Sequence, residues 1–570
     1  MTARRTARSA EHGFTPVRRS AEHGFTPVRR SAEHGFTPVR RSAEHGFTLV
    51  EVMVSLLIFG MIAAAGVAIL SFSVKAQSAT GTKLDDLGAL TRTMSILSAD
   101  LGQAALRGTR DESGAPLPAF VGEGGSDVVP MLRLVRGGWT NIDGAARSST
   151  QKVAYRVADG ALQRIAYPMV DGAPPLPPAV LLPNVRQVRL RYRLGGAWSD
   201  RWDGVQGVPL PEAMELSVQR TDGLVYRQLF LVGSGYAPPA REVQNEAPEQ
   251  ERGAALLTVL MLVAIVAVMA GAALEKLRLS TRLAGNAAAG EQARAYALAA
   301  ETLALTRIDA MLGPNVKRVT LQGDWSGKPF GMPLPGGGFA TARVRDGGNC
   351  FNLNSLVSGR AGAYVTDPLM RPQFVRLMRL LDIPAQVGEQ IAAGAADWID
   401  SDQDQQAMGA EDGAYLNRET PYRTAGTLMT DPSELRAVVG MTPQIYATLR
   451  PWICTLPVAQ AAPINVNTLL PEQAPILAML FPDTMSIAGA RQMILQRPPQ
   501  GVATTDVFFK SAALQGNANA DGERGTAVVS KWFTLDIDVT VGTTVLQEQA
   551  LMDATTLPAR LVSRQWGEPS

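Results

Sequence analysis

The chain has 570 residues, of which 46% are hydrophobic, and a formal net charge of +2 at pH 7. This length allows about three or four ordinary domains, and the near-neutral charge gives no indication of a nucleic-acid or acidic partner. All four histidines lie near the N-terminus, at His12, His23, His34 and His45. The rest of the chain lacks the commonest general base and zinc ligand, which excludes most histidine-based catalysis.

The first 45 residues form a tandem repeat, RRSAEHGFTPV, with a period of 11 residues. A period of 11 is typical of right-handed coiled coils, but each unit contains a Pro, a Gly and too few apolar residues for a seam. We therefore interpret the repeat as an expansion of the coding DNA and predict a leader at 1–46. In the fourth copy, Leu49 replaces the Pro of the earlier copies.

An apolar run, FTLVEVMVSLLIFGMIAAAGVAILSFSV, begins at Phe47 and contains Glu51 as its only charge. The run is long enough to span a bilayer as a helix. Arg40 and Arg41 precede it and predict a cytoplasmic N-terminus with an exported C-terminal domain. Because no small-residue cleavage site follows the run, unlike in an ordinary secretory signal, the expected processing point precedes it, at Gly46.

Apolar side chains then recur every three or four residues as far as Leu101, so the predicted helix continues beyond the span and covers 47–110. Residues 111–236 alternate strand-like segments with turn signals, and Ala158-Asp159-Gly160 is the predicted hairpin turn between two strands. The Pro- and Glu-rich stretch 237–253 is predicted to be a linker and a second leader.

The pattern restarts at residue 251. Arg252-Gly253 precedes an uncharged run, Ala254–Leu274, which is just long enough to span a membrane and opens a predicted helix over 254–310. Residues 311–570 contain strand-like segments near both ends and helical segments over about 360–515. Helices inserted in a strand-rich frame predict an α+β half.

The segment Gly46-Phe47-Thr48-Leu49-Val50-Glu51 and the run behind it resemble the class III signal of type IV pilins and their type II secretion relatives. The resemblance implies a prepilin peptidase that cuts after Gly46 and methylates the new amine of Phe47. The segments LRLVRGGWTN, QKVAYRVADGALQRIAYP and LGGAWSDRW resemble the J minor pseudopilin of type II secretion systems.

The second half resembles the K minor pseudopilin through Arg252-Gly253 with its span, CFNLN at Cys350, ADWIDSDQDQQAMGAEDGAY, PWIC and INVNT. Cleavage after Gly253 would make Ala254 the first residue. The fifth residue after this cut is Thr258 instead of Glu, a departure that is typical of the K kind. Together the resemblances imply an α+β fold with two pilin-like units, each a long N-terminal transmembrane helix packed on a small antiparallel sheet, the second with a large helical insertion.

Glu51 is a lone carboxylate inside the first span. Such a charge costs about 2.5–3.5 kcal/mol on insertion scales and therefore needs a partner. The processed amine of a neighbouring subunit is the expected partner, and a snorkelling acid near the bilayer edge is the alternative. Because Thr258 replaces this acid in the second half, we hypothesise that the K kind caps the assembly, where no further amine needs neutralising.

An acidic loop in the second half is the candidate metal site. Its carboxylates are Asp397, Asp400, Asp402, Asp404, Glu411 and Asp412. Alternating acids in a tight loop offer the hard oxygen ligands that calcium prefers, and the K resemblance supports calcium. Glu411 is twelfth counting from Asp400, as in an EF-hand, but Gln405 stands sixth, where an EF-hand needs glycine. The alternative is a solvated acidic loop.

The two cysteines, Cys350 and Cys454, both lie in the second half. An exported domain permits a disulfide between them, and two free buried thiols are the alternative.

The INVNT segment, Ile464–Thr468, looks like the start of a helix-hairpin-helix DNA-binding module. Such a module needs a glycine hairpin whose backbone amides meet a phosphate. The corresponding turn here, Asp483-Thr484-Met485-Ser486, has an acid and no glycine. We therefore predict a structural helical insertion and no nucleic-acid partner.

These features predict a structural protein, not an enzyme. The predicted partners are the I-kind pseudopilin, the major G kind, the prepilin peptidase and the inner membrane, with a single pass per unit and periplasmic globular domains. Minor pilins of a type IV pilus and a membrane-tethered helix-hairpin-helix DNA-uptake protein are the alternatives. In an intact chain, a second span after a periplasmic first domain would run inward. We therefore predict that the halves act as separate polypeptides, through a fused gene model, internal initiation or an early cut.

Overall fold

The computed structural model describes residues 48–125, 129–204, 208–233, 259–323, 325–335, 337–481, 484–510 and 520–567. The chain divides into two compact units, 1–75 and 76–570. The repeat, the linker and the expected processing residues Gly46, Phe47, Gly253 and Ala254 lie outside the described residues, as does Thr258.

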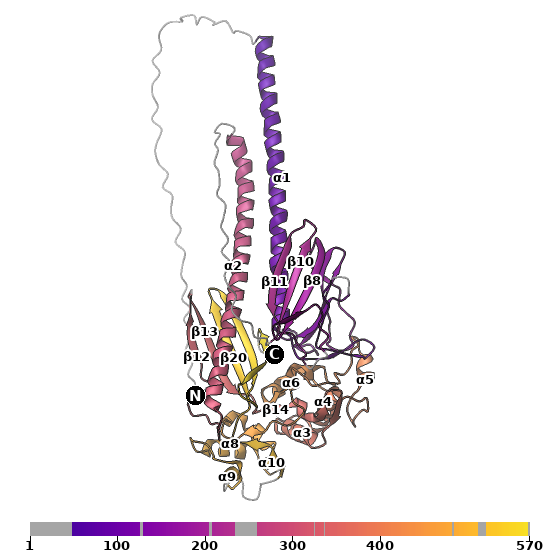
Figure 1. Ribbon diagram of the computed structural model, residues 1–570, viewed down its shortest axis with the longest axis vertical. Coiled ribbons are helices and arrows are strands. Elements are labelled where there is room, and N and C mark those ends of the chain that lie inside the picture. The colour runs from indigo at the N-terminus through magenta and orange to yellow at the C-terminus, as the bar shows by residue number, and fades with distance from the viewer. Residues whose placement is uncertain are drawn as a thin grey trace, which may run out of the picture. The chain divides into compact units, whose positions relative to one another are not determined.

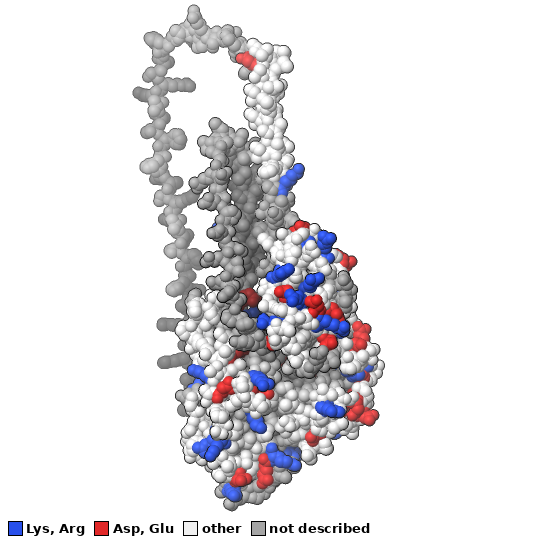
Figure 2. All heavy atoms as spheres, viewed as in Figure 1, with Lys and Arg blue, Asp and Glu red and all other residues white. Residues whose placement is uncertain are grey.

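Helix α1 (Leu49–Gly102) is the long N-terminal helix that the sequence predicts (Figure 1). Its segment Leu49–Ile69 is long and apolar enough to cross a membrane, and it is the one such segment among the described residues. Figure 2 shows this segment as an almost uncharged surface. The Thr48 backbone N–H donates a 3.0 Å hydrogen bond to the Glu51 carboxylate, which caps the first turn.

The first half of the second unit, residues 76–233, combines the C-terminal part of α1 with two antiparallel sheets. Their strand orders are β3-β4-β5-β6-β7 and β11-β10-β8-β9. The strands are β1 (Thr109–Arg110), β2 (Pro116–Leu117), β3 (Phe120–Gly122), β4 (Leu132–Arg136), β5 (Gln151–Ala158), β6 (Ala161–Ala166), β7 (Ala179–Leu182), β8 (Val185–Leu194), β9 (Ala197–Ser199), β10 (Ala213–Arg220) and β11 (Val225–Leu231).

The apolar stripe of α1 covers this core. Ala89, Leu97 and Leu101 are buried in one cluster with the sheet residues. The predicted hairpin is confirmed, and its turn consists of Asp159 and Gly160, which have φ values of 52° and 66°. Ala158, which the prediction placed in the turn, instead ends β5 and pairs with Ala161. Positive φ at both central residues is the requirement of a type I′ turn, a common two-residue hairpin loop.

The second half, residues 259–567, sets α2 (Val259–Leu312) on a five-stranded antiparallel sheet with the order β12-β13-β20-β21-β22. Ala293, Ala297, Ala300 and Ala304 are fully buried in the core that α2 shares with this sheet. Their spacing of three and four residues places them on one helix face, where small side chains permit a close approach.

The strands of this half are β12 (Phe330–Leu334), β13 (Gly338–Asp346), β14 (Phe351–Asn352), β15 (Val357–Arg360), β16 (Ala363–Thr366), β17 (Ile453–Cys454), β18 (Ile464–Asn465), β19 (Thr526–Ala527), β20 (Trp532–Val541), β21 (Thr544–Asp553) and β22 (Arg560–Trp566). The helices inserted between β13 and β20 are α3 (Met370–Leu380), α4 (Ala385–Ile399), α5 (Asp412–Leu416), α6 (Pro443–Leu449), α7 (Ala474–Ala478), α8 (Ile487–Gln496), α9 (Thr505–Phe509) and α10 (Ala520–Arg524).

The α+β class with several antiparallel sheets is therefore confirmed. Among the described residues, Leu49–Ile69 is the one segment that is long and apolar enough to span a membrane, so the second predicted span is not shown. Within the insertion, a disulfide joins Cys350 to Cys454 across 104 residues, beside the short parallel pair β14 and β17. The disulfide ties the start of the insertion to the segment behind α6.

Candidate cation site and interdomain contact

Three carboxylates of the acidic loop converge inside the insertion. Asp397 lies in the last turn of α4, Asp400 caps that helix, and Glu411 immediately precedes α5. Their side chains each place an oxygen within 4.8 Å of the other two. All three residues are buried, with exposed fractions of 0%, 2% and 6%. The C-terminal end of α4 and the residue that precedes α5 thus bring three carboxylates together where water is excluded.

Two of these carboxylates, Asp400 and Glu411, lack part of the hydrogen bonding that burial demands. One oxygen of Asp400 and one of Glu411 are buried without a partner among the described residues. Burial, opposed by hydrogen bonds from the backbone, raises the pKa of Asp397 to about 6. Burial and the neighbouring acids raise the pKa of Asp400 to about 7 and of Glu411 to about 9. Orphaned buried oxygens with mutual repulsion fit a bound cation with a preference for oxygen ligands.

The loop backbone supports the site. The backbone N–H of Gln406 donates to both oxygens of Asp397 at 3.2 Å. A Cβ at Gly409 would lie 2.0 Å from an oxygen of Asp397, so only glycine allows this approach. In this loop the glycine that permits the close packing is Gly409, and not a glycine at the sixth position as in an EF-hand.

The other three predicted ligands are not part of this group of converging oxygens. Asp402 and Asp404 are exposed, and the Asp404 backbone N–H donates to Asp402 at 2.9 Å. Asp412 is turned toward two arginines, with Arg110 donating to both of its oxygens at 2.9 Å and Arg423 donating at 2.7 Å. The pKa of Asp412 is lowered below its usual value. Burial alone would raise this pKa, but the hydrogen bonds from Arg423 and Thr424 and the charge of Arg110 outweigh the effect of burial.

Arg110 belongs to the first half, so Asp412 forms part of a contact between the two halves. At the centre of this contact, Arg107 of the first half is fully buried between Asp171 and Glu434, at 2.7 and 3.0 Å. Glu434 comes from a 3-10 helix of the second half, Pro432–Ala437. A fully desolvated guanidinium is tolerated only when it is paired in this way.

Further hydrogen bonds cross the contact, among them the following. The Ser149 backbone N–H donates to Ser433 Oγ at 2.6 Å. Arg564 of β22 donates to the carbonyl oxygen of Gly233 at 2.6 Å and is itself paired with Glu301 of α2. Burial and the adjacent Glu301 carboxylate raise the pKa of Glu548, the next acid beside Arg564. No sequence signal distinguished these arginines, because their partners lie far away in the chain.

Comparison with known proteins identifies both halves. The family model "Type II secretion system (T2SS), protein J" matches 68–232, and "Type II secretion system (T2SS), protein K" matches 349–458 and 464–530. A "Prokaryotic N-terminal methylation motif" matches 41–67. The type II secretion system protein K of Pectobacterium carotovorum subsp. carotovorum is 34% identical over 322 residues, covering 56% of this chain and 97% of the relative. Protein J of Klebsiella pneumoniae is 32% identical over 190 residues, covering 33% of this chain and 94% of the relative.

The chain belongs to the protein J and protein K families of the type II secretion system. The resemblance to the J and K pseudopilins that the sequence indicated is therefore confirmed. Both families are structural and not enzymatic. The methylation motif and the apolar N-terminal helix indicate a pilin-type protein of the inner membrane. Residues 76–233 and 259–567 are called the J half and the K half below.

A solved structure that resembles the chain is the complex of GspK, GspI and GspJ from enterotoxigenic Escherichia coli. Its matching chain is 34% identical, with a TM-score of 0.44, and the match covers 49% of this chain and 96% of that chain.

The INVNT segment of the K half has a structural role. The Asn465 side-chain amide donates to the Val319 carbonyl oxygen at 3.1 Å and to Ser530 at 2.8 Å. The Asn467 amide donates to the Val502 carbonyl oxygen at 2.9 Å. Both asparagines are buried, so they satisfy backbone groups where the insertion joins the sheet.

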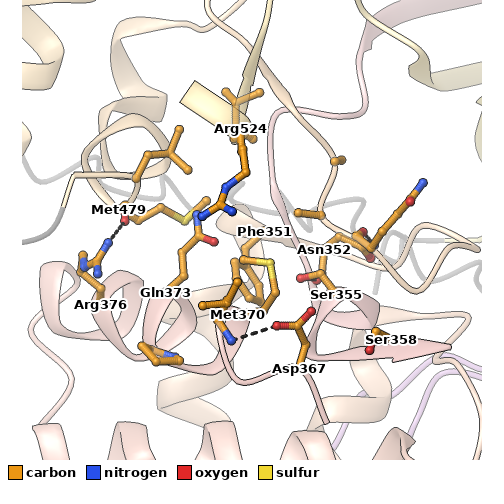
Figure 3. A pocket seen from close by; sticks show the side chains of 18 of the residues that line it. Phe351, Asn352, Ser355, Ser358, Asp367, Met370, Gln373, Arg376, Met479 and Arg524 are labelled. Carbon is orange, nitrogen blue, oxygen red and sulfur yellow. Dashed lines mark hydrogen bonds between the residues drawn. The ribbon is translucent and has the colours of Figure 1, made fainter. Parts of the chain in front are cut away.

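A cleft of about 570 Å³ lies beside α3 in the K half (Figure 3). Figure 3 shows Phe351 and Met370 close together, with Gln373 beside them and Arg524 above. Among its polar groups, Arg376 donates to the Met479 carbonyl oxygen at 2.6 Å.

We predict that Arg107→Met strongly destabilises the contact, because it leaves the Asp171 and Glu434 carboxylates buried without a cation. The free energy of unfolding should fall by about 3–5 kcal/mol in urea titrations of the full chain. Exposed Arg189→Met is the matched control and should change it by less than about 0.5 kcal/mol. Equal effects of the two substitutions would contradict a central role for Arg107.

We predict that Glu548→Gln reduces the pH dependence of stability. A carboxyl whose pKa is raised on folding stabilises the fold while protonated, and this gain is lost as the pH rises through the folded-state pKa. Glutamine keeps an acceptor for Trp566, which donates to Glu548 at 2.7 Å, without titrating. From about pH 6 to about pH 9, the wild type should lose at least about 1 kcal/mol more than the variant. Exposed Glu419→Gln should retain the wild-type profile.

Proposed function

We propose that the J and K halves join an I-kind pseudopilin in a tip complex that initiates a periplasmic pseudopilus and helps to export folded proteins across the outer membrane. The major G kind would extend the pseudopilus below this tip. The observation that carries the proposal is the buried Arg107 contact, which holds a J-type and a K-type domain together. The solved Escherichia coli complex, in which GspK, GspI and GspJ occur together, supports the same set of partners.

A cleft of about 580 Å³ between α1, β11 and α2 offers a place for the I-kind subunit. Its lining includes Leu90 and Met94 of α1, Leu229 of β11 and Ala288 of α2. β11 is an edge strand, and Leu229 is 47% exposed. We propose that the N-terminal helix of the I-kind subunit packs here, because a third apolar helix would cover these side chains.

Each half would have its own membrane span, with the globular domains in the periplasm. The prepilin peptidase would cut after Gly46 and after Gly253 and methylate the amine of Phe47. The halves would then act as separate polypeptides. Glu51 would pair with the processed amine of a neighbouring subunit, and the K half would cap the tip.

For the acidic loop of the K half we propose a calcium ion held by Asp397, Asp400 and Glu411. The supporting observations are the convergence of their oxygens and the unpartnered buried oxygens of Asp400 and Glu411. Carboxylate oxygens of this number and hardness suit calcium. The exposed Asp402 and Asp404 lie on the same loop and remain proposed contributors to the site.

We predict two mature N-termini in the membrane fraction. Mass spectrometry of active cells should recover one species that begins at methylated Phe47 and another that begins at Ala254. Gly46→Val should block the first cut without affecting the second, because the peptidase reads each signal separately. Recovery of only the full-length chain from cells with working secretion would refute the processing and the separate action of the halves.

We predict that calcium binds the cation-free full chain with measurable heat in calorimetry. Joint replacement of Asp400→Asn and Glu411→Gln should weaken binding at least about tenfold, because two anionic ligands are lost. Exposed Glu472→Gln removes one charge from the K half and should leave the affinity unchanged. Binding that the double replacement does not weaken would place calcium elsewhere.

A further inference from the structure

The two ends of the acidic loop are anchored unequally. Asp400 caps the long helix α4 and accepts a 2.9 Å hydrogen bond from Thr366. Glu411 accepts only longer bonds to one oxygen, from Gln403 at 3.3 Å and Thr424 at 3.4 Å, and its other oxygen has no partner among the described residues. The position of Glu411 therefore depends largely on the backbone of the residue that follows it.

That residue, Asp412, is fixed from the J half. Arg110 donates from both terminal nitrogens to both oxygens of Asp412, and a paired fork of this kind fixes orientation as well as distance. From the K half, Arg423 and the backbone N–H of Thr424 complete the set at 2.7 and 3.0 Å. A residue of the J half thus holds the chain directly beside a carboxylate of the cation site.

A hydroxyl group connects the two sites. Thr424 Oγ1 lies 3.2 Å from Arg110 Nη1, 3.0 Å from an Asp412 oxygen and 3.4 Å from a Glu411 oxygen. Because Arg110 can only donate, the hydroxyl accepts from Arg110 and keeps its own proton for the carboxylates. Loss of Arg110 would free this hydroxyl to reorient, in addition to releasing Asp412.

We propose that Arg110 of the J half is a positioning residue for the cation site of the K half, so that the cation and the contact between the halves stabilise each other. The inference rests on the calcium site proposed above. Without Arg110, the mutual repulsion of Asp397, Asp400 and Glu411 would displace the weakly held Glu411 end of the loop. Since coupling of binding free energies is reciprocal, a cation that fixes Glu411 also fixes Asp412 for Arg110.

Simple electrostatics predicts the opposite effect of removing Arg110. A guanidinium near a cation site repels the cation, so neutralising Arg110 would tighten calcium binding if charge alone mattered. Positioning predicts weaker binding. The direction of the change therefore separates the two explanations.

The test is calorimetric titration of the cation-free full chain with calcium chloride. Arg110→Gln should weaken calcium binding at least about fivefold, at the lower end of typical couplings between sites. Exposed Arg186→Gln removes the same charge from the J half and should leave the affinity unchanged. Arg110→Lys keeps the charge but loses the fork, so it should also weaken binding, and thermal unfolding checks that each variant is folded.

A second measurement detects the coupling in the J half and needs no substitution at Arg110. In the wild type, calcium should slow amide hydrogen exchange over residues 108–115, and Asp400→Asn should reduce this effect. Unchanged or tighter calcium binding by folded Arg110→Gln and Arg110→Lys would overturn the coupling while the calcium site stands. A wild-type chain that takes up no calcium would overturn the calcium site itself, and this inference with it.

Discussion

The structure of the second unit depends on one desolvated charge, the guanidinium of Arg107. A buried arginine must have carboxylates around it, and here one carboxylate comes from the J half and one from the K half. Arg110 follows on the same short segment behind α1 and pairs with Asp412. The segment that follows helix α1 thus brings two arginines to the helical insertion of the K half. This arrangement favours one relative position of the two halves, because a shift of one half against the other would leave buried charges unpaired.

The insertion itself is organised by buried amides as much as by its apolar core. Asn354 donates to the carbonyl oxygens of Met429 and Leu456, both at 2.8 Å, and accepts from the Met429 backbone N–H. Asn352 and Asn465 bind backbone groups of distant segments in the same manner. Short motifs such as CFNLN and INVNT therefore satisfy irregular backbone where regular strands are short.

Local patterns predicted much of this fold. The apolar span, the leucine stripe of α1 and the hairpin at Asp159-Gly160 follow from periodicity and turn chemistry within a few residues. The loop sequence also located the acidic cluster, but spacing could not show that Asp412 turns away toward Arg110. Such pairs join residues about 300 positions apart, and no local rule relates them.

The contact also bears on whether the halves need a covalent connection. Linking two domains raises their effective concentration, which matters most when the interface itself is weak. Here the J half is held at several separate points, by Arg107, by Arg110 and at Gly233, whose carbonyl oxygen binds Arg564. Because Gly233 precedes the expected cut after Gly253, this anchor would survive processing. A cation that fixes the position of Asp412 would then strengthen the association of the two halves after the covalent link is cut.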